Sequence, residues 1–180
     1  MIRRPTTRSG RRTGPELTAA VVVGVGISLS LSTLMLVAIM EHVSKLPMPL
    51  AVAFAAHVFG RATLGMTLLL PVGLLLHVGY VSTATVVARM VFHCRLGVVA
   101  AFGTALGLWV LAGVSVLPYL GWGVFGAGLG RGAVLSVLAV HLLYGAFLWI
   151  GSWLGAGGPN TGVPPGAART TPATAVAAQR

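Results

Sequence analysis

Long apolar runs separated by short polar connections dominate this chain. Four runs, over residues 17–40, 63–90, 97–117 and 133–154, are each long enough to cross about 30 Å of hydrocarbon as a helix. Nearly all of the prolines and charges lie outside these runs, in the connections and at the two ends of the chain. The pattern therefore predicts an all-α membrane protein with four transmembrane helices.

The first apolar run has a recognisable helix start. Pro15 suits a first helical turn because the N–H that it lacks has no partner there, and Glu16 is favoured by the positive end of the helix dipole. The run that follows exceeds the roughly 7–15 residues of a signal-peptide core, and no small-x-small cleavage site comes after it. We expect an uncleaved membrane anchor.

Two stretches near the second span leave alternatives open. Residues 51–62 are apolar but contain His57 and Arg61, so they either lie along the membrane interface or extend the second helix outward. Within the second span, Pro71 and Gly73 are candidates for a bend, because proline removes a backbone donor.

Both ends of the chain differ in composition from the predicted transmembrane domain, residues 16–154. Residues 1–15 hold five arginines and no apolar period, which predicts a disordered basic arm. Residues 155–180 are rich in Gly, Pro, Thr and Ala, which predicts a flexible, disordered tail.

Composition supports the membrane assignment. Of the 180 residues, 56% are hydrophobic and 8% are charged, whereas about a quarter of residues in soluble domains are charged. A net charge of +10 is compatible with binding to nucleic acid, but outside the apolar runs the sequence has no soluble folded domain that could contact the grooves of a duplex. We therefore expect no nucleic-acid partner and expect anionic lipid at the basic N-terminus.

The lysines and arginines predict an orientation. Nine lie in the N-terminal arm, the connection between the second and third spans, and the tail; three lie on the other side, Lys45, Arg61 and Arg131. The positive-inside rule then places both termini in the cytoplasm, with the helices in the cytoplasmic (plasma) membrane. The four spans form two tandem hairpins of the same sense, and the second and fourth helices run in the same direction.

A short motif occurs once in each of these two helices. His77-Val78-Gly79-Tyr80 and His141-Leu142-Leu143-Tyr144 both place a histidine and a tyrosine one helical turn apart in an apolar run. Such side chains are costly to leave unpaired in hydrocarbon, so we expect a polar site inside the membrane, with internal duplication left open. The two His-x-x-Tyr pairs have three candidate roles: hydrogen bonds that stabilise the helix bundle, a path for protons or small solutes, and axial ligation of a b-type haem.

Small residues recur every four positions on two spans. Gly24, Ser28 and Ser32 form one stripe on the first helix, and Gly103 with Gly107 forms another on the third. Such spacing lets helix backbones approach closely. We interpret both stripes as helix-packing faces, internal ones in preference to faces of a homodimer or larger membrane complex.

Several classes of chemistry lack the residues that they need. No Asp or Glu lies within the apolar runs, which argues against carboxylate metal sites and cation-coupled carriers. No nucleophile motif surrounds the serines, so we expect no enzyme, and we assign no catalytic residue, metal site or cofactor. His42, His57 and Glu41 are interpreted as solvated surface residues, and the single Cys94 as a spectator in preference to a palmitoylation or metal site.

The third and fourth spans carry a familiar pattern. Leu117-Pro118 precedes Gly121-Trp122-Gly123-Val124-Phe125-Gly126, and His141-Leu142-Leu143-Tyr144-Gly145 follows in the last helix. Over roughly residues 60–154 the chain resembles small prokaryotic four-helix integral membrane proteins of unknown function, the YagU-like proteins among them. The second helix departs from His-x-x-Tyr-Gly by carrying Val81. The resemblance implies an inner-membrane protein without an assigned reaction.

Together these features predict a polytopic inner-membrane protein that is a non-enzymatic membrane component or accessory subunit. The alternative is a small-solute or proton transporter or channel that uses His77 and His141, and a b-type haem protein comes third.

Overall fold

The computed structural model describes residues 13–92 and 96–156, and this part of the chain is helical with no strand. Four segments are long and apolar enough to cross a membrane: Glu16–Met40, Thr67–Val91, Val98–Tyr119 and Arg131–Trp153. The prediction of an all-helical chain with four membrane-length apolar helices is confirmed. Most of the predicted basic arm, almost all of the tail, and Cys94 lie outside the described residues.

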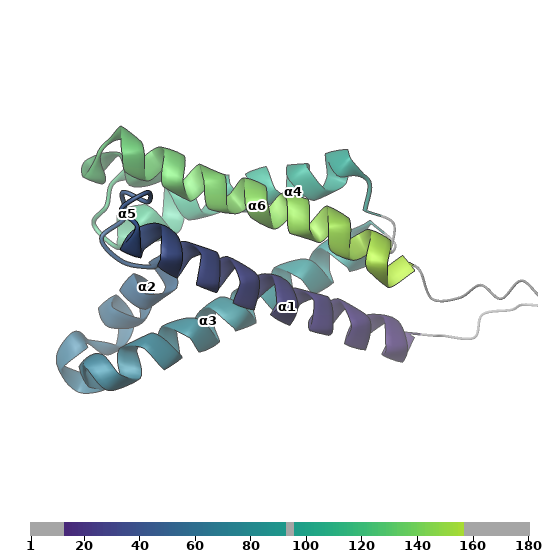
Figure 1. Cartoon of the computed structure of the whole chain (residues 1–180), viewed down its shortest axis with the longest axis horizontal. Coiled ribbons are helices and arrows are strands. Elements are labelled where there is room, and N and C mark those ends of the chain that lie inside the picture. The colour runs from purple at the N-terminus through teal and green to yellow at the C-terminus, as the bar shows by residue number, and fades with distance from the viewer. Residues whose placement is uncertain (1–12, 93–95, 157–180) are drawn as a thin grey trace, which may run out of the picture.

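Helical elements make up most of the described residues (Figure 1). In chain order they are α1 (Thr13–Met40), α2 (Leu50–Phe59), α3 (Arg61–Val91), α4 (Val98–Leu111), the π-helical turn η1 (Ala112–Val116), α5 (Leu117–Tyr119), the 3₁₀ segment η2 (Val124–Leu129) and α6 (Arg131–Ala156).

The long helices pack in a fixed order. Helix α1 packs against α3 on one side and α6 on the other, and α4 packs against α6. The start of α1 and the end of α6 lie at the same end of the molecule, while α2, α5 and η2 lie at the opposite end (Figure 1). The helix start predicted around Pro15 agrees with α1, which begins at Thr13.

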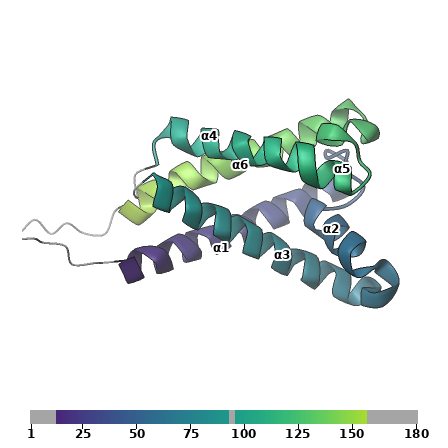
Figure 2. The same ribbon diagram turned by 180° about the vertical axis from the view of Figure 1, so that it is seen from behind.

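Helices α3 and α4 diverge along the molecule. They lie closest near the end where α1 begins and α6 ends, and they separate toward the end that holds α2 (Figure 2). At the narrow end, the guanidinium of the buried Arg89 donates to the carbonyl of Gly151 at 3.1 Å, which ties α3 to α6. At the wide end, α2 packs against α3.

Residues 51–62 do not extend the second membrane helix outward. Gly60 adopts φ 80° and separates α2 from α3, so the chain reverses between them. Gly73 on α3 then lies directly against α2, because a Cβ there would come within 2.8 Å of the Cα of Val52. The non-helical backbone inside α3 is at Gly65 (φ 61°, ψ 170°), whereas Pro71 lies inside the helix, and the bend at Pro71 and Gly73 stays a prediction.

The third membrane segment changes its winding near its end. Residues Ala112–Val116 form a π-helical turn, and Pro118, which has no backbone N–H, follows it. Phe125 from η2 adopts φ 55° and fills the space beside this turn. Its ring lies 4.5 Å from that of Trp109, centroid to centroid, and fills the position that a side chain at Gly113 would need.

The two stripes of small residues have different environments. On α1, a Cβ at Gly24 would lie 2.7 Å from the Cα of Ser82 on α3, and Ser28 is fully buried, so this stripe is an internal packing face. Gly103 and Gly107 on α4 are exposed, and a Cβ on either would meet no other atom within 4 Å. The interpretation of that pair as an internal packing face is wrong.

Candidate functional site

A cavity of about 870 Å³ lies where the helices diverge. Its walls come from α1, the start of α2, α3, the end of α4 with η1, and α6. All four residues of the repeated motif line it: His77, Tyr80, His141 and Tyr144. The volume is within the usual range of about 300–1,000 Å³ for ligand sites in proteins.

The cavity wall is mostly apolar. Leucine, valine, alanine and proline side chains form most of it, and a few hydroxyl groups accompany the imidazoles and phenols. Leu70, Leu74 and Leu111 belong to the lining and are also exposed at the surface, on α3 and α4. The cavity therefore opens sideways between α3 and the membrane-length segment Val98–Tyr119 that begins with α4.

His77 is held by a side chain from another helix. Its Nδ1 lies 2.6 Å from the hydroxyl oxygen of Ser32 on α1. A serine hydroxyl can donate or accept, so this contact is compatible with either neutral tautomer of the imidazole. Ser32, predicted as a packing residue, is thus also the residue that orients His77.

His141 is held by its own helix in one tautomer. Its Nδ1 lies 2.8 Å from the backbone oxygen of Val137. A carbonyl oxygen only accepts, so Nδ1 carries the proton and donates it, and in the neutral ring Nε2 then carries the lone pair. Within residues 13–92 and 96–156, Nε2 of neither His141 nor His77 has a hydrogen-bond partner.

The two tyrosines differ in exposure and in hydrogen bonding. Tyr144 is 4% exposed, and its hydroxyl lies 3.4 Å from Oγ1 of Thr85 on α3. Because Thr85 already donates its proton to the carbonyl of Val81 at 2.8 Å, the phenol is the donor to Thr85. Tyr80 is 45% exposed, and no hydrogen bond from its hydroxyl occurs in the described part of the chain.

The two copies of the motif therefore share one cavity without sharing one set of contacts. Each histidine bonds through Nδ1, but one partner is a hydroxyl on a second helix and the other a carbonyl on the same helix. One tyrosine is a buried contact between helices, and the other faces the opening.

Part of the cavity lining has no signal in the sequence. The first turn of α2 contributes Leu50, Ala51 and Val52, which reach the cavity only because α2 folds back along α3. The π-helical turn contributes Ala112 and Ser115, and the only hint in the sequence is the proline that follows it. Neither contribution follows from periodicity.

Comparisons with known proteins add no assignment. No family model, curated protein or solved structure matches this chain. The resemblance to YagU-like proteins therefore stays a prediction. Among the described residues, no group of three or more His, Cys, Asp or Glu side chains is placed to hold a metal ion.

Proposed function

We propose that this chain is a non-enzymatic membrane component that holds a lipid-soluble ligand in the cavity between its diverging helices. His77 and His141 supply the polar contacts. In this proposal the four helices cross the plasma membrane as two tandem hairpins with both termini in the cytoplasm.

One observation carries the proposal. Two imidazoles from different helices line the same cavity, and each is fixed through Nδ1 while its Nε2 has no partner in the described part of the chain. A polar group fixed in an apolar cavity and left partly unsatisfied is the usual arrangement of a ligand contact.

The shape and lining of the cavity support a ligand from the bilayer. The opening lies between α3 and the segment Val98–Tyr119 that begins with α4, both long enough to cross a membrane, so a molecule dissolved in the lipid can enter sideways. The apolar wall favours retention of such a molecule over conduction, because a conduit needs polar groups or water along its length. The transporter alternative is therefore less well supported.

The tautomer of His141 restricts the ligand further. Neutral Nε2 of this ring accepts a hydrogen bond, so the matching group on the ligand is a donor such as a hydroxyl. A long-chain or ring alcohol, or a quinol, has this combination of an apolar body and one or two hydroxyl groups.

The test is to identify what copurifies with the protein. Protein purified in mild detergent is extracted with organic solvent, and the extract is analysed by mass spectrometry. The variants are His141→Phe, Ala84→Leu, which adds bulk inside the cavity, and Ala139→Leu, which adds the same bulk on the exposed side of α6. We expect one lipid species enriched with wild type and Ala139→Leu and lost from the other two. Equal lipid profiles in all four proteins would contradict the proposal.

A b-type haem is the second candidate, because the same imidazole pair favours it. Haem iron accepts two axial imidazoles, and ligation uses the lone pair that His141 carries on Nε2. Visible spectra of oxidised and reduced protein separate the two candidates. A Soret band that is lost in His77→Ala or His141→Ala would establish the haem, and a colourless protein would exclude it.

A further inference from the structure

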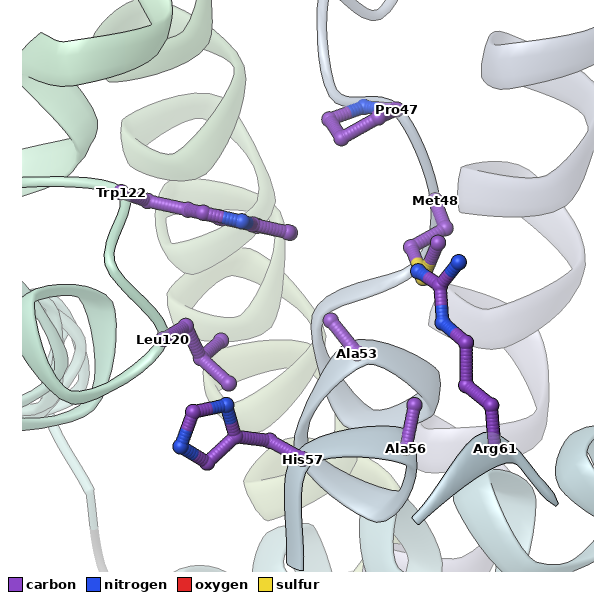
Figure 3. A pocket seen from close by; sticks show the side chains of 8 residues that line it. All are labelled: Pro47, Met48, Ala53, Ala56, His57, Arg61, Leu120 and Trp122. Atoms are coloured by element: carbon purple, nitrogen blue, oxygen red, sulfur yellow. The ribbon is translucent and has the colours of Figure 1, made fainter. Parts of the chain in front are cut away.

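A second, smaller pocket lies at the α2 end of the molecule, outside the main cavity. Its volume is about 330 Å³, and Figure 3 shows its walls. The chain segment before α2 contributes Pro47 and Met48, α2 contributes Ala53, Ala56 and His57, the first residue of α3 contributes Arg61, and the segment after α5 contributes Leu120 and Trp122. Helix α2 separates the two spaces, since its Phe54 lines the main cavity.

The ionisable side chains that line this pocket are both basic, Arg61 and His57. Arg61 is exposed, and its Nη2 lies 3.7 Å from the thioether sulfur of Met48, a weak acceptor. Figure 3 shows the His57 ring on the other side of the pocket from Arg61. This ring lies 4.6 Å from that of Tyr119, centroid to centroid, in an edge-on contact. Trp122 forms the opposite wall.

No carboxylate belongs to this lining. The whole chain has two acidic residues, Glu16 and Glu41, and neither lines the pocket. A guanidinium exposes five donors, which match the oxygens of a phosphate in a two-pronged contact, and a thioether satisfies them poorly. The pocket therefore has a positive charge and hydrogen-bond donors that favour binding of an anion from outside the chain.

The position of the pocket indicates the source of that anion. It lies at the ends of apolar helices, next to the Trp122 indole and the Tyr119 phenol, the two side chains that favour the boundary between membrane and water. Lipid phosphates lie at this depth when the helices span a bilayer.

We propose that this pocket binds the phosphodiester headgroup of an anionic phospholipid, with Arg61 as the principal contact. His57 and Trp122 line the same space and complete the wall around the headgroup. The site does not depend on the ligand of the main cavity, because α2 lies between the two.

The test measures binding of short-chain phosphatidylglycerol to the detergent-purified full chain, by native mass spectrometry and by the shift in melting temperature. Short-chain phosphatidylcholine and inorganic phosphate are the comparison ligands. Arg61→Gln removes the contact, and Ala53→Leu fills the pocket without changing the charge. Arg131→Gln is the matched control, because it removes an exposed arginine that does not line the pocket.

We expect phosphatidylglycerol to bind best, and Arg61→Gln and Ala53→Leu each to weaken its binding about tenfold or more, as for loss of a charge-assisted hydrogen bond. Arg131→Gln should change it less than about twofold. Equal losses in Arg61→Gln and Arg131→Gln would overturn the site in favour of general charge attraction. Inorganic phosphate binding as tightly as phosphatidylglycerol would overturn the lipid as its ligand.

Discussion

The hydroxyl of Ser32 on α1 lies 2.6 Å from Nδ1 of His77 on α3, 45 residues further along the chain. The contact joins a residue of the small-residue stripe to a residue of the repeated motif. It fixes the ring at the wall of the main cavity and contributes a polar interaction between two membrane-length helices. Packing and the candidate site are therefore linked at this point.

Replacing Ser32 by Ala should lower the free energy of unfolding by about 1 kcal/mol, because the variant leaves Nδ1 of the partly buried His77 without its partner. Ser30→Ala is the matched control, since that exposed hydroxyl bonds only the carbonyl of Gly26 in its own helix. Unfolding of both variants in mixed micelles by added sodium dodecyl sulfate gives the comparison. Equal stability of the two variants would contradict a structural role for the contact between Ser32 and His77.

The contact between Thr85 and Tyr144 should appear as a coupling energy. The two hydroxyls lie 3.4 Å apart in the buried region between α3 and α6. The losses in unfolding free energy caused by Thr85→Val and by Tyr144→Phe should therefore be less than additive, by about 0.6 kcal/mol. A double-mutant cycle of unfolding free energies measures this coupling. The cycle of Thr85→Val with Tyr80→Phe is the control and should give no coupling, because the exposed Tyr80 does not bond Thr85.

Gly24 should tolerate no side chain at the present distance between α1 and α3. A Cβ there would lie 2.7 Å from the Cα of Ser82, and backbone atoms cannot move aside as a flexible side chain can. We expect Gly24→Ala to destabilise the protein by about 1–3 kcal/mol, as for other overpacked cores. Gly26→Ala, two residues away and with nothing within 4 Å, should be neutral or stabilising. Similar melting temperatures for the two variants would mean that α1 and α3 do not approach this closely.

The proposed orientation predicts which engineered cysteines react from outside the cell. Both replacements are made in a Cys94→Ser background: Arg131→Cys at the start of α6, at the α2 end of the molecule, and Gly97→Cys just before α4, at the end where α1 begins. Both positions are exposed. A membrane-impermeant maleimide applied to intact cells should label Arg131→Cys at once and Gly97→Cys only after the membrane is permeabilised. The reverse order would invert the topology.

The sequence by itself determined the class of fold and the number of membrane-length helices, because hydrophobic run length is a local property that a span of about 20 residues already carries. It also selected His77, Tyr80, His141 and Tyr144, since polar rings inside apolar runs are visible in one dimension. All four line the main cavity. The local pattern contained no information on their hydrogen-bond partners.

Only the tertiary structure decided what depends on distances between residues far apart in the chain. The reversal at Gly60 places α2 along α3, and the divergence of α3 from α4 opens the cavity that the histidines share. Gly103 and Gly107 have the same spacing as the stripe on α1 and yet face outward, because the choice of helix face depends on which neighbour packs there. Spacing along a helix gives a face, and packing against other helices decides whether that face is buried.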